Sequence, residues 1–177
     1  MPRPSLALPL VLVALLAAAC GGSKTPNGPD AQAAAVTTTG AGVYPGDGAS
    51  KQALARWMGA AASAAGLPPE LPVMAALVAS NLTDMKGGDR NSVGFFQMRV
   101  GIWNQGKYPG YPDKPELQLE WFVDQALAAG KKRAAAGIDG EDSSEWGDWV
   151  ADVERPPSQY RGRYQLRLDE ARQLLGS

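Results

Sequence analysis

The chain has 177 residues, carries 17 Lys and Arg against 18 Asp and Glu, and is 45% hydrophobic. This length and composition favour one folded domain with appendages and exclude a wholly disordered protein. The formal net charge of −1 provides no extended basic surface. We therefore do not expect DNA or RNA as a partner.

Histidine is absent from the sequence, and Cys20 is its single cysteine. Ser-His-Asp and Cys-His nucleophile systems, His-ligated zinc and thiolate clusters each lack a required member. We expect no metal and no organic cofactor. Carboxylates, Lys and Tyr remain as acid-base groups, and glycoside cleavage is one of the few hydrolytic-type reactions that carboxylates alone can run.

Residues 1–19 predict a signal peptide, because Arg3 precedes an apolar run of 14 residues, 6–19, that is too short to span a bilayer. The sequence Ala17-Ala18-Ala19-Cys20 resembles the lipobox of bacterial lipoproteins, which implies lipidation of Cys20. That family usually has Leu at the position of Ala17, and the three alanines also suit ordinary signal cleavage. Lipidation is favoured because Cys20 has no disulfide partner. We expect an exported lipoprotein on the outer face of a membrane.

Residues 20–48 are rich in Gly, Pro, Ala and Thr and have no apolar period, which indicates a flexible tether behind Cys20. The segment 24–48 would have a root-mean-square reach of roughly 25 to 30 Å. The folded part, residues 49–177, would then work a few nanometres from the membrane.

Apolar spacings of three and four predict the helices of this folded part. Ser50 is a plausible N-cap for a helix over 51–65, and the Ala-rich helix 70–82 is apolar on most of its surface, as expected for a buried central helix. An apolar run, 93–98, and an aromatic loop, 100–114, follow it.

Three more helices are predicted towards the C-terminus. One runs from Pro115 to about Gly130 and is followed by a solvated basic end, 131–133; a short helix is capped by Ser144; the last helix starts at Ser158. No run of alternating strand residues is present. The fold class is therefore all-α, a single domain of about five helices.

The stretch 71–99 carries the most informative motifs. Ala79-Ser80 lies near the end of the central helix, a polar turn occupies 87–92, and Gly94-Phe95-Phe96-Gln97 follows. This arrangement resembles the lysozyme-like superfamily of lytic transglycosylases and goose-type lysozymes, in its actinobacterial and phage-type branch. Over 51–175, the resemblance implies a lysozyme-like fold and peptidoglycan glycan strands as the ligand.

In that family the central helix carries one essential glutamate followed by serine, and Ala79 stands at the glutamate's position. The glutamate protonates the glycosidic oxygen and then takes a proton from the sugar's C6 hydroxyl, and a methyl group does neither. Loss of such a group typically costs a factor of about 100 to 10,000 in rate. The resemblance thus implies a groove that has kept its shape and lost its chemistry.

Asp84 and Asp89 are the two carboxylates that could replace the missing acid. Both also have a simpler explanation, Asp84 as a helix-ending residue and Asp89 as part of a turn or local ion pair with Arg90. A working lytic enzyme with a relocated acid therefore stays open as an alternative to glycan binding.

The resemblance makes Gln97 the strongest ligand candidate, because a polar side chain entering an apolar segment needs a partner. Ser80 and Ser92 are groove hydroxyls or local backbone partners, and Trp103 and Tyr108 are platforms for sugar rings or packing anchors. A protein-protein interaction domain, with the groove given over to an envelope partner, is the third hypothesis. Four tryptophans are assigned to the core: Trp57, Trp121, Trp146 and Trp149.

Overall fold

The computed structural model describes residues 42–177. The predicted signal peptide, Cys20 and the tether up to residue 41 lie outside these residues. The described part is mostly helical, so the all-α prediction is confirmed; it has six α-helices where about five were expected, because the aromatic loop contains a short extra one. None of its helices combines the length and apolar character needed to cross a bilayer.

The elements follow one another in a simple order, with one short hairpin between the second and third helices. The helices are α1 (Lys51–Ala64), α2 (Glu70–Ala79), α3 (Val100–Trp103), α4 (Pro115–Ala135), α5 (Trp146–Glu154) and α6 (Leu168–Leu175). Strands β1 (Ser92–Val93) and β2 (Met98–Arg99) pair antiparallel, with Val93 opposite Met98. Short 3-10 turns occupy Asp89–Asn91, Tyr111–Asp113, Ser143–Glu145, Ser158–Arg163 and Gln165–Arg167.

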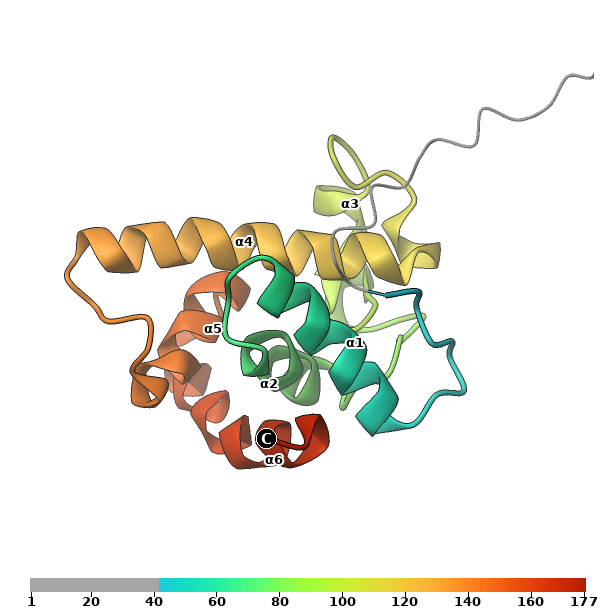
Figure 1. Cartoon of the computed structure of the whole chain (residues 1–177). Helices are drawn as coiled ribbons and strands as arrows, with labels where there is room; N and C mark the ends of the chain where they lie inside the picture. The colour runs from blue at the N-terminus through green and yellow to red at the C-terminus, as the bar shows by residue number, and fades with distance from the viewer. Residues whose placement is uncertain (1–41) are drawn as a thin grey trace, which may run out of the picture. The chain divides into compact units, whose positions relative to one another are not determined.

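Helix α2 lies at the centre of the domain, in contact with α1, α4, α5 and α6. Figure 1 shows α4 along one side, α6 on the opposite side, and α1 and α2 between them. Every residue of α2 from Glu70 to Leu77 is buried, as its apolar composition predicts. Val78 and Ala79 are the first residues of this helix to reach solvent, so the end of α2 is the part of the core that opens to the surface.

Helix α4 continues to Ala135, and the prediction that it ends near Gly130 is wrong. Gly130 is instead a packing notch, since a Cβ atom there would lie 2.5 Å from Cζ2 of Trp149. The glycine lets α5 approach α4 closely. The indole N–H of Trp149 donates to the carbonyl of Ala126 at 2.9 Å, one turn before the notch.

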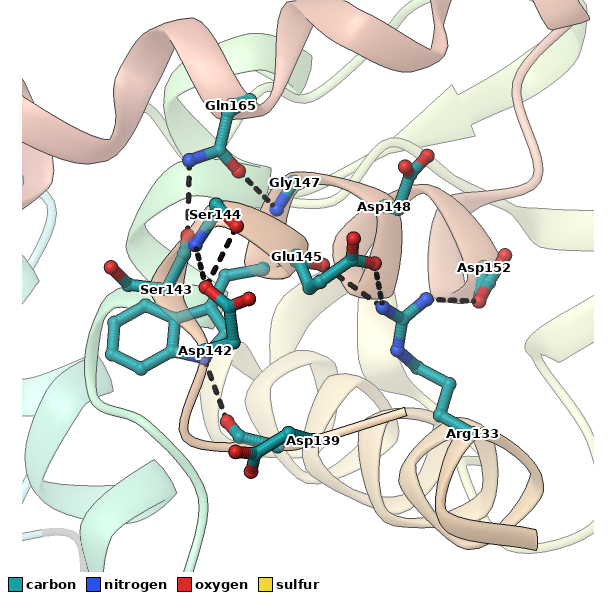
Figure 2. Close-up of polar contacts among 12 residues, drawn as sticks. Arg133, Asp139, Asp142, Ser143, Ser144, Glu145, Gly147, Asp148, Asp152 and Gln165 are labelled. Carbon is teal, nitrogen blue, oxygen red and sulfur yellow. Dashed lines mark hydrogen bonds and ion pairs between the residues drawn. The ribbon is translucent and has the colours of Figure 1, made fainter. Parts of the chain in front are cut away.

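The prediction that residues 131–133 form a solvated basic helix end is only partly correct. Lys131 and Lys132 are exposed, but Arg133 is buried. Its guanidinium lies 2.9 Å from Oε2 of Glu145 and 3.0 Å from Oδ2 of Asp152. Figure 2 shows the side chain reaching from α4 to these two carboxylates. A bridged guanidinium of this kind fixes the angle between two helices.

Two predicted helix starts differ in the structure. Ser144 does not cap α5, which begins at Trp146 without a side-chain cap. Asp142 instead caps the 3-10 turn Ser143–Glu145 before α5, where its carboxylate accepts the backbone N–H of Ser144 at 3.0 Å. Hydrogen bonds from the Ser144 hydroxyl, at 2.7 Å, and from this N–H lower the pKa of Asp142. The segment after Ser158 forms 3-10 turns before α6 begins at Leu168, and Gly162, a poor helix former, lies in that segment.

Gly42 and Tyr44, within the predicted tether, contact the helical part of the chain, although most of residues 42–48 are exposed. The ring of Tyr44 lies 5.0 Å from that of Trp57 and 6.2 Å from that of Phe95. The indole N–H of Trp57 donates to the carbonyl of Gly42. The prediction that four tryptophans belong to the core is confirmed by burial of Trp57, Trp121, Trp146 and Trp149.

Candidate functional site

The end of α2 is shaped by a left-handed turn directly after Ala79. The N–H groups of Ser80 and Leu82 both donate to the carbonyl of Ala76, at 3.0 and 3.1 Å. Asn81 and Leu82 have φ of 55° and 58°, which closes the helix three residues earlier than the apolar pattern predicts. Ala79 therefore becomes the last helical residue, half-buried at the point where the chain turns away.

Ser80 connects α2 to the hairpin. Its hydroxyl donates to the carbonyl of Phe95 at 2.8 Å and accepts the N–H of Thr83 at 3.3 Å. The side chain is buried. Both hydrogen-bonding capacities of the hydroxyl are thus used within the protein, which makes Ser80 a link between helix and hairpin rather than an open ligand group.

Gln97 is half-buried and lies over the hairpin turn with φ of 48°. Its amide nitrogen donates to the carbonyl of Gly94 at 3.1 Å, and its Oε1 is 3.2 Å from the hydroxyl of Ser92. Ser92 also donates to the carbonyl of Asp89 at 2.6 Å. The structure therefore brings Ser92 and Gln97 together, while the second hydrogen on the Gln97 amide has no partner among the described residues.

Gln118, a residue of α4 that sequence analysis missed, fixes the hairpin to that helix. It is fully buried, its Oε1 accepts the N–H of Phe95 at 2.8 Å, and its Nε2 donates to Asp84 at 3.0 Å and to the carbonyl of Tyr111 at 3.2 Å. A Cβ atom on Gly94, whose φ is +86°, would lie 2.3 Å from Oε1 of Gln118. This position of the turn therefore requires glycine.

The two fallback acids differ sharply in their surroundings. The Asp84 side chain is 2% exposed, and its two oxygens accept from Lys86 at 2.7 Å and from Gln118. The hydrogen bond to Asp84 raises the pKa of Lys86. The Asp89 side chain is 90% exposed and 3.4 Å from the guanidinium of Arg90. Neither carboxylate combines partial burial with an oxygen free to face a glycosidic bond.

The aromatic loop is largely anchored to α4. Tyr108 is buried and donates to Asp124 at 2.6 Å, and burial together with this bond raises its pKa above its usual range. Tyr111 is fully buried and donates to the carbonyl of Met98, and burial raises its pKa to about 12. Trp103 is half-buried, with its ring 5.3 Å from that of Trp121. It keeps more surface for a sugar ring than Tyr108.

A cavity of about 460 Å³ opens beside the end of α2. It is lined by Val78 of α2 and by Arg163, Leu166 and Arg167 of the 3-10 turns before α6. Val78 directly precedes Ala79 in the sequence, but adjacent residues of a helix face different directions, and Ala79 does not line the cavity. Its lining is apolar and cationic, and it contains no carboxylate that could act as a proton donor.

Comparison of the chain with protein-family models, with curated proteins and with solved structures found no match. Within residues 42–177, no group of three or more His, Cys, Asp or Glu side chains is placed to hold a metal ion.

Proposed function

We propose that this protein is an exported envelope lipoprotein whose lysozyme-like domain binds peptidoglycan glycan strands at the end of α2 without cleaving them. One observation carries the proposal: the buried central helix reaches the surface at Ala79, the position that the resemblance assigns to the family's essential acid, and the side chain there is a methyl group. Proton transfer to a glycosidic oxygen requires a group that Ala79 lacks.

The frame around Ala79 supports binding over a purely structural role. Ser80, Gln97 and Gln118 hold the helix end, the hairpin and α4 in one hydrogen-bonded arrangement. Five of the six non-glycine residues with positive φ in the described part lie between Asn81 and Gln97. Such strain is concentrated at ligand sites, where surrounding contacts over-determine the backbone.

The alternative of a relocated acid is supported less well. Asp84 is engaged by two partners, and Asp89 is exposed on the polar turn. A general acid works best when an apolar environment favours its protonated form and one oxygen faces the scissile bond. Neither residue combines these conditions.

The test measures soluble products and sedimentation after the purified chain is mixed with peptidoglycan sacculi. Three proteins are compared: the native chain, Ala79→Glu and Ala79→Gln. The glutamine variant is the matched control, because its side chain is as large as that of glutamate and carries no acidic proton. We expect all three to sediment with sacculi and Ala79→Glu alone to release anhydromuropeptides. Products from the native chain would show a working enzyme, and failure of all three to sediment would overturn the glycan-binding proposal.

A further inference from the structure

The segment between α5 and α6 is basic, although the whole chain has a net charge of −1. Residues 155–167 contain four arginines and no acidic residue. Arg161 is neutralised within the protein, because it pairs with Asp148 at 3.2 Å and with Asp152 at 2.7 Å. The other three arginines are the cations that this segment can offer to a partner.

Two of these arginines lie close together on an exposed part of the segment. Among residues 42–177, Arg163 forms no ion pair, and its guanidinium lies 4.0 Å from the centre of the Tyr160 ring. Arg167 pairs with Glu170 at 2.8 Å, and both side chains of this pair keep more than a third of their surface in solvent. The local charge is therefore positive and open to a large anionic partner.

The same surface carries exposed apolar groups. Leu166 is 81% exposed and Tyr160 is 39% exposed. Leu166 also lines the cavity beside Val78, together with Arg163 and Arg167. A single exposed leucine is common on proteins, but a leucine and a tyrosine among guanidinium groups have the composition of a surface that contacts lipid headgroups.

The backbone that presents these side chains is fixed to α5. Gln165 accepts the N–H of Gly147 at 2.6 Å and donates to the carbonyl of Ser143 at 3.0 Å, as Figure 2 shows. A Cβ atom on Gly147 would lie 2.5 Å from Cβ of Gln165, so this close approach requires glycine. The basic and apolar side chains project from a pre-organised backbone, which lowers the entropy lost when they meet a partner.

We propose that residues 158–167 form a contact surface for an anionic membrane, an inference that rests on the lipoprotein part of the proposed function. Lipid phosphate groups would pair with Arg163 and Arg167, and Leu166 would enter the boundary between headgroups and acyl chains. A second copy of the chain is a poorer occupant, because a two-fold contact would bring these like charges together.

The predicted tether makes a weak contact of this kind sufficient. Residues 21–41 would join the lipidated Cys20 to the domain, and a chain of that length spans at most about 70 Å. A domain of the size of residues 42–177 is roughly 35 to 40 Å across. The anchor would therefore let every face of the domain reach the lipid at high local concentration. Charge and exposed apolar area then select the face.

The test measures vesicle binding by flotation for the processed chain, residues 20–177, at rising lipid concentration and under reducing conditions. Vesicles of phosphatidylglycerol and phosphatidylcholine in equal parts are compared with vesicles of phosphatidylcholine alone. The variant Arg163→Gln/Arg167→Gln is compared with Lys131→Gln/Lys132→Gln, which removes the same charge at exposed positions of α4. Circular dichroism and the thermal midpoint check that all variants fold.

We expect the native chain and the lysine control to bind the anionic vesicles, and this binding to weaken with added salt. The arginine variant should bind them about 5- to 30-fold less tightly, because each cation near an anionic surface contributes up to a factor of about five. All proteins should bind phosphatidylcholine alone weakly and to the same extent.

A second pair of variants tests the apolar part of the surface. Leu166→Ser should weaken binding to anionic vesicles by about 3- to 10-fold. Ile102→Ser is the matched control, since Ile102 is also exposed, at 46%, and lies outside the proposed surface. Hydrogen exchange on the native chain should slow at the amides of residues 158–167 when anionic vesicles are added.

Equal binding of both vesicle types by the native chain, or equal binding by the native chain and the arginine variant, would overturn the membrane contact. The glycan proposal would stand in that case, because sedimentation with sacculi involves no lipid. Sedimentation velocity tests the other occupant: a dimer that Leu166→Ser abolishes would make this face an interface between copies, and the inference would be wrong.

The lipoprotein part of the proposed function has a separate readout, the mass of the protein recovered from bacterial membranes. A lipid adduct on Cys20 supports it. An unmodified Cys20 would refute it, together with the membrane contact that depends on it. A lipidated Cys20 combined with no preference for anionic vesicles would refute the membrane contact alone.

Discussion

Replacing Glu154 with Gln is expected to remove a pH-dependent loss of stability. Glu154 is the last residue of α5, and its Oε1 exposes less than 1 Å² and has no hydrogen-bond partner. Burial raises the pKa of this carboxyl to about 8 from its usual 4.5. The folded protein therefore keeps Glu154 protonated at neutral pH, where the unfolded chain has released the proton.

The direction of the effect follows from proton binding. Between pH 4.5 and about 8, the folded state holds a proton that the unfolded state lacks, so the free energy of unfolding falls as pH rises. The slope is about 1.4 kcal/mol per pH unit, which amounts to about 3 kcal/mol between roughly pH 5 and 7 and about 5 kcal/mol once the window is complete. Below the unfolded pKa the loss is absent.

Glutamine has nearly the same shape and no proton to release, so the stability of Glu154→Gln relative to the native chain should increase with this slope. Urea unfolding followed by tryptophan fluorescence, repeated at pH values across the window, measures the difference directly. Glu141→Gln is the matched control, because Glu141 is exposed. A constant difference between Glu154→Gln and the native chain at every pH would refute the reasoning, since it would mean that the carboxyl ionises freely in the fold.

Three further substitutions test the packing of the domain. Gln118→Met keeps the side-chain volume but leaves the Phe95 N–H unpaired. We expect a loss of about 2 to 4 kcal/mol in the free energy of chemical unfolding and faster hydrogen exchange at that amide. Unchanged exchange would show that Gln118 does not hold the hairpin. Gly130→Ala should lower the free energy of unfolding by about 1 to 3 kcal/mol, because the new methyl group would clash with Trp149. Helix propensity alone predicts a gain of about 1 kcal/mol. A lower thermal midpoint would support the packing notch, and a higher one would contradict it. Arg133→Met leaves two carboxylates without their shared cation and should cost about 2 kcal/mol in chemical unfolding; a neutral result would make the bridge dispensable.

Much of the helical fold was predictable because apolar spacing is a local property of the sequence. The buried α2 and the four core tryptophans follow from such patterns. Gly130 was misinterpreted because a glycine that stops a helix and one that admits a neighbour look identical in sequence. What distinguishes them is Trp149, which reaches Gly130 only in the folded chain. The same reason explains Arg133, whose partners come from a different helix.

Residues of the candidate site could be predicted where they belong to a continuous sequence motif. Residues that only tertiary contacts bring to the site could not. Ala79 and Gln97 were proposed because they lie in a continuous motif; the structure places Ala79 at the end of α2 and joins the hairpin that carries Gln97 to it through the bond from Ser80 to Phe95. Gln118 was missed, although a polar amide on the same helical face as the fully buried Phe122 and Ala126 is a signal of a buried hydrogen-bonding residue. Arg163 gave no such signal, because arginines on a polar segment are common and only the fold brings this one to Val78.

The backbone around the helix end also favours binding over loss of every function. A non-glycine residue in the left-handed region costs of order 1 kcal/mol or more, and neither Leu82 nor Gln97 is one of the residue types that adopt this region readily. Burial of Leu82 and the bond from Gln97 to the Gly94 carbonyl hold them there. The left-handed backbone near Ala79 therefore supports the proposed binding surface over a fold with no ligand.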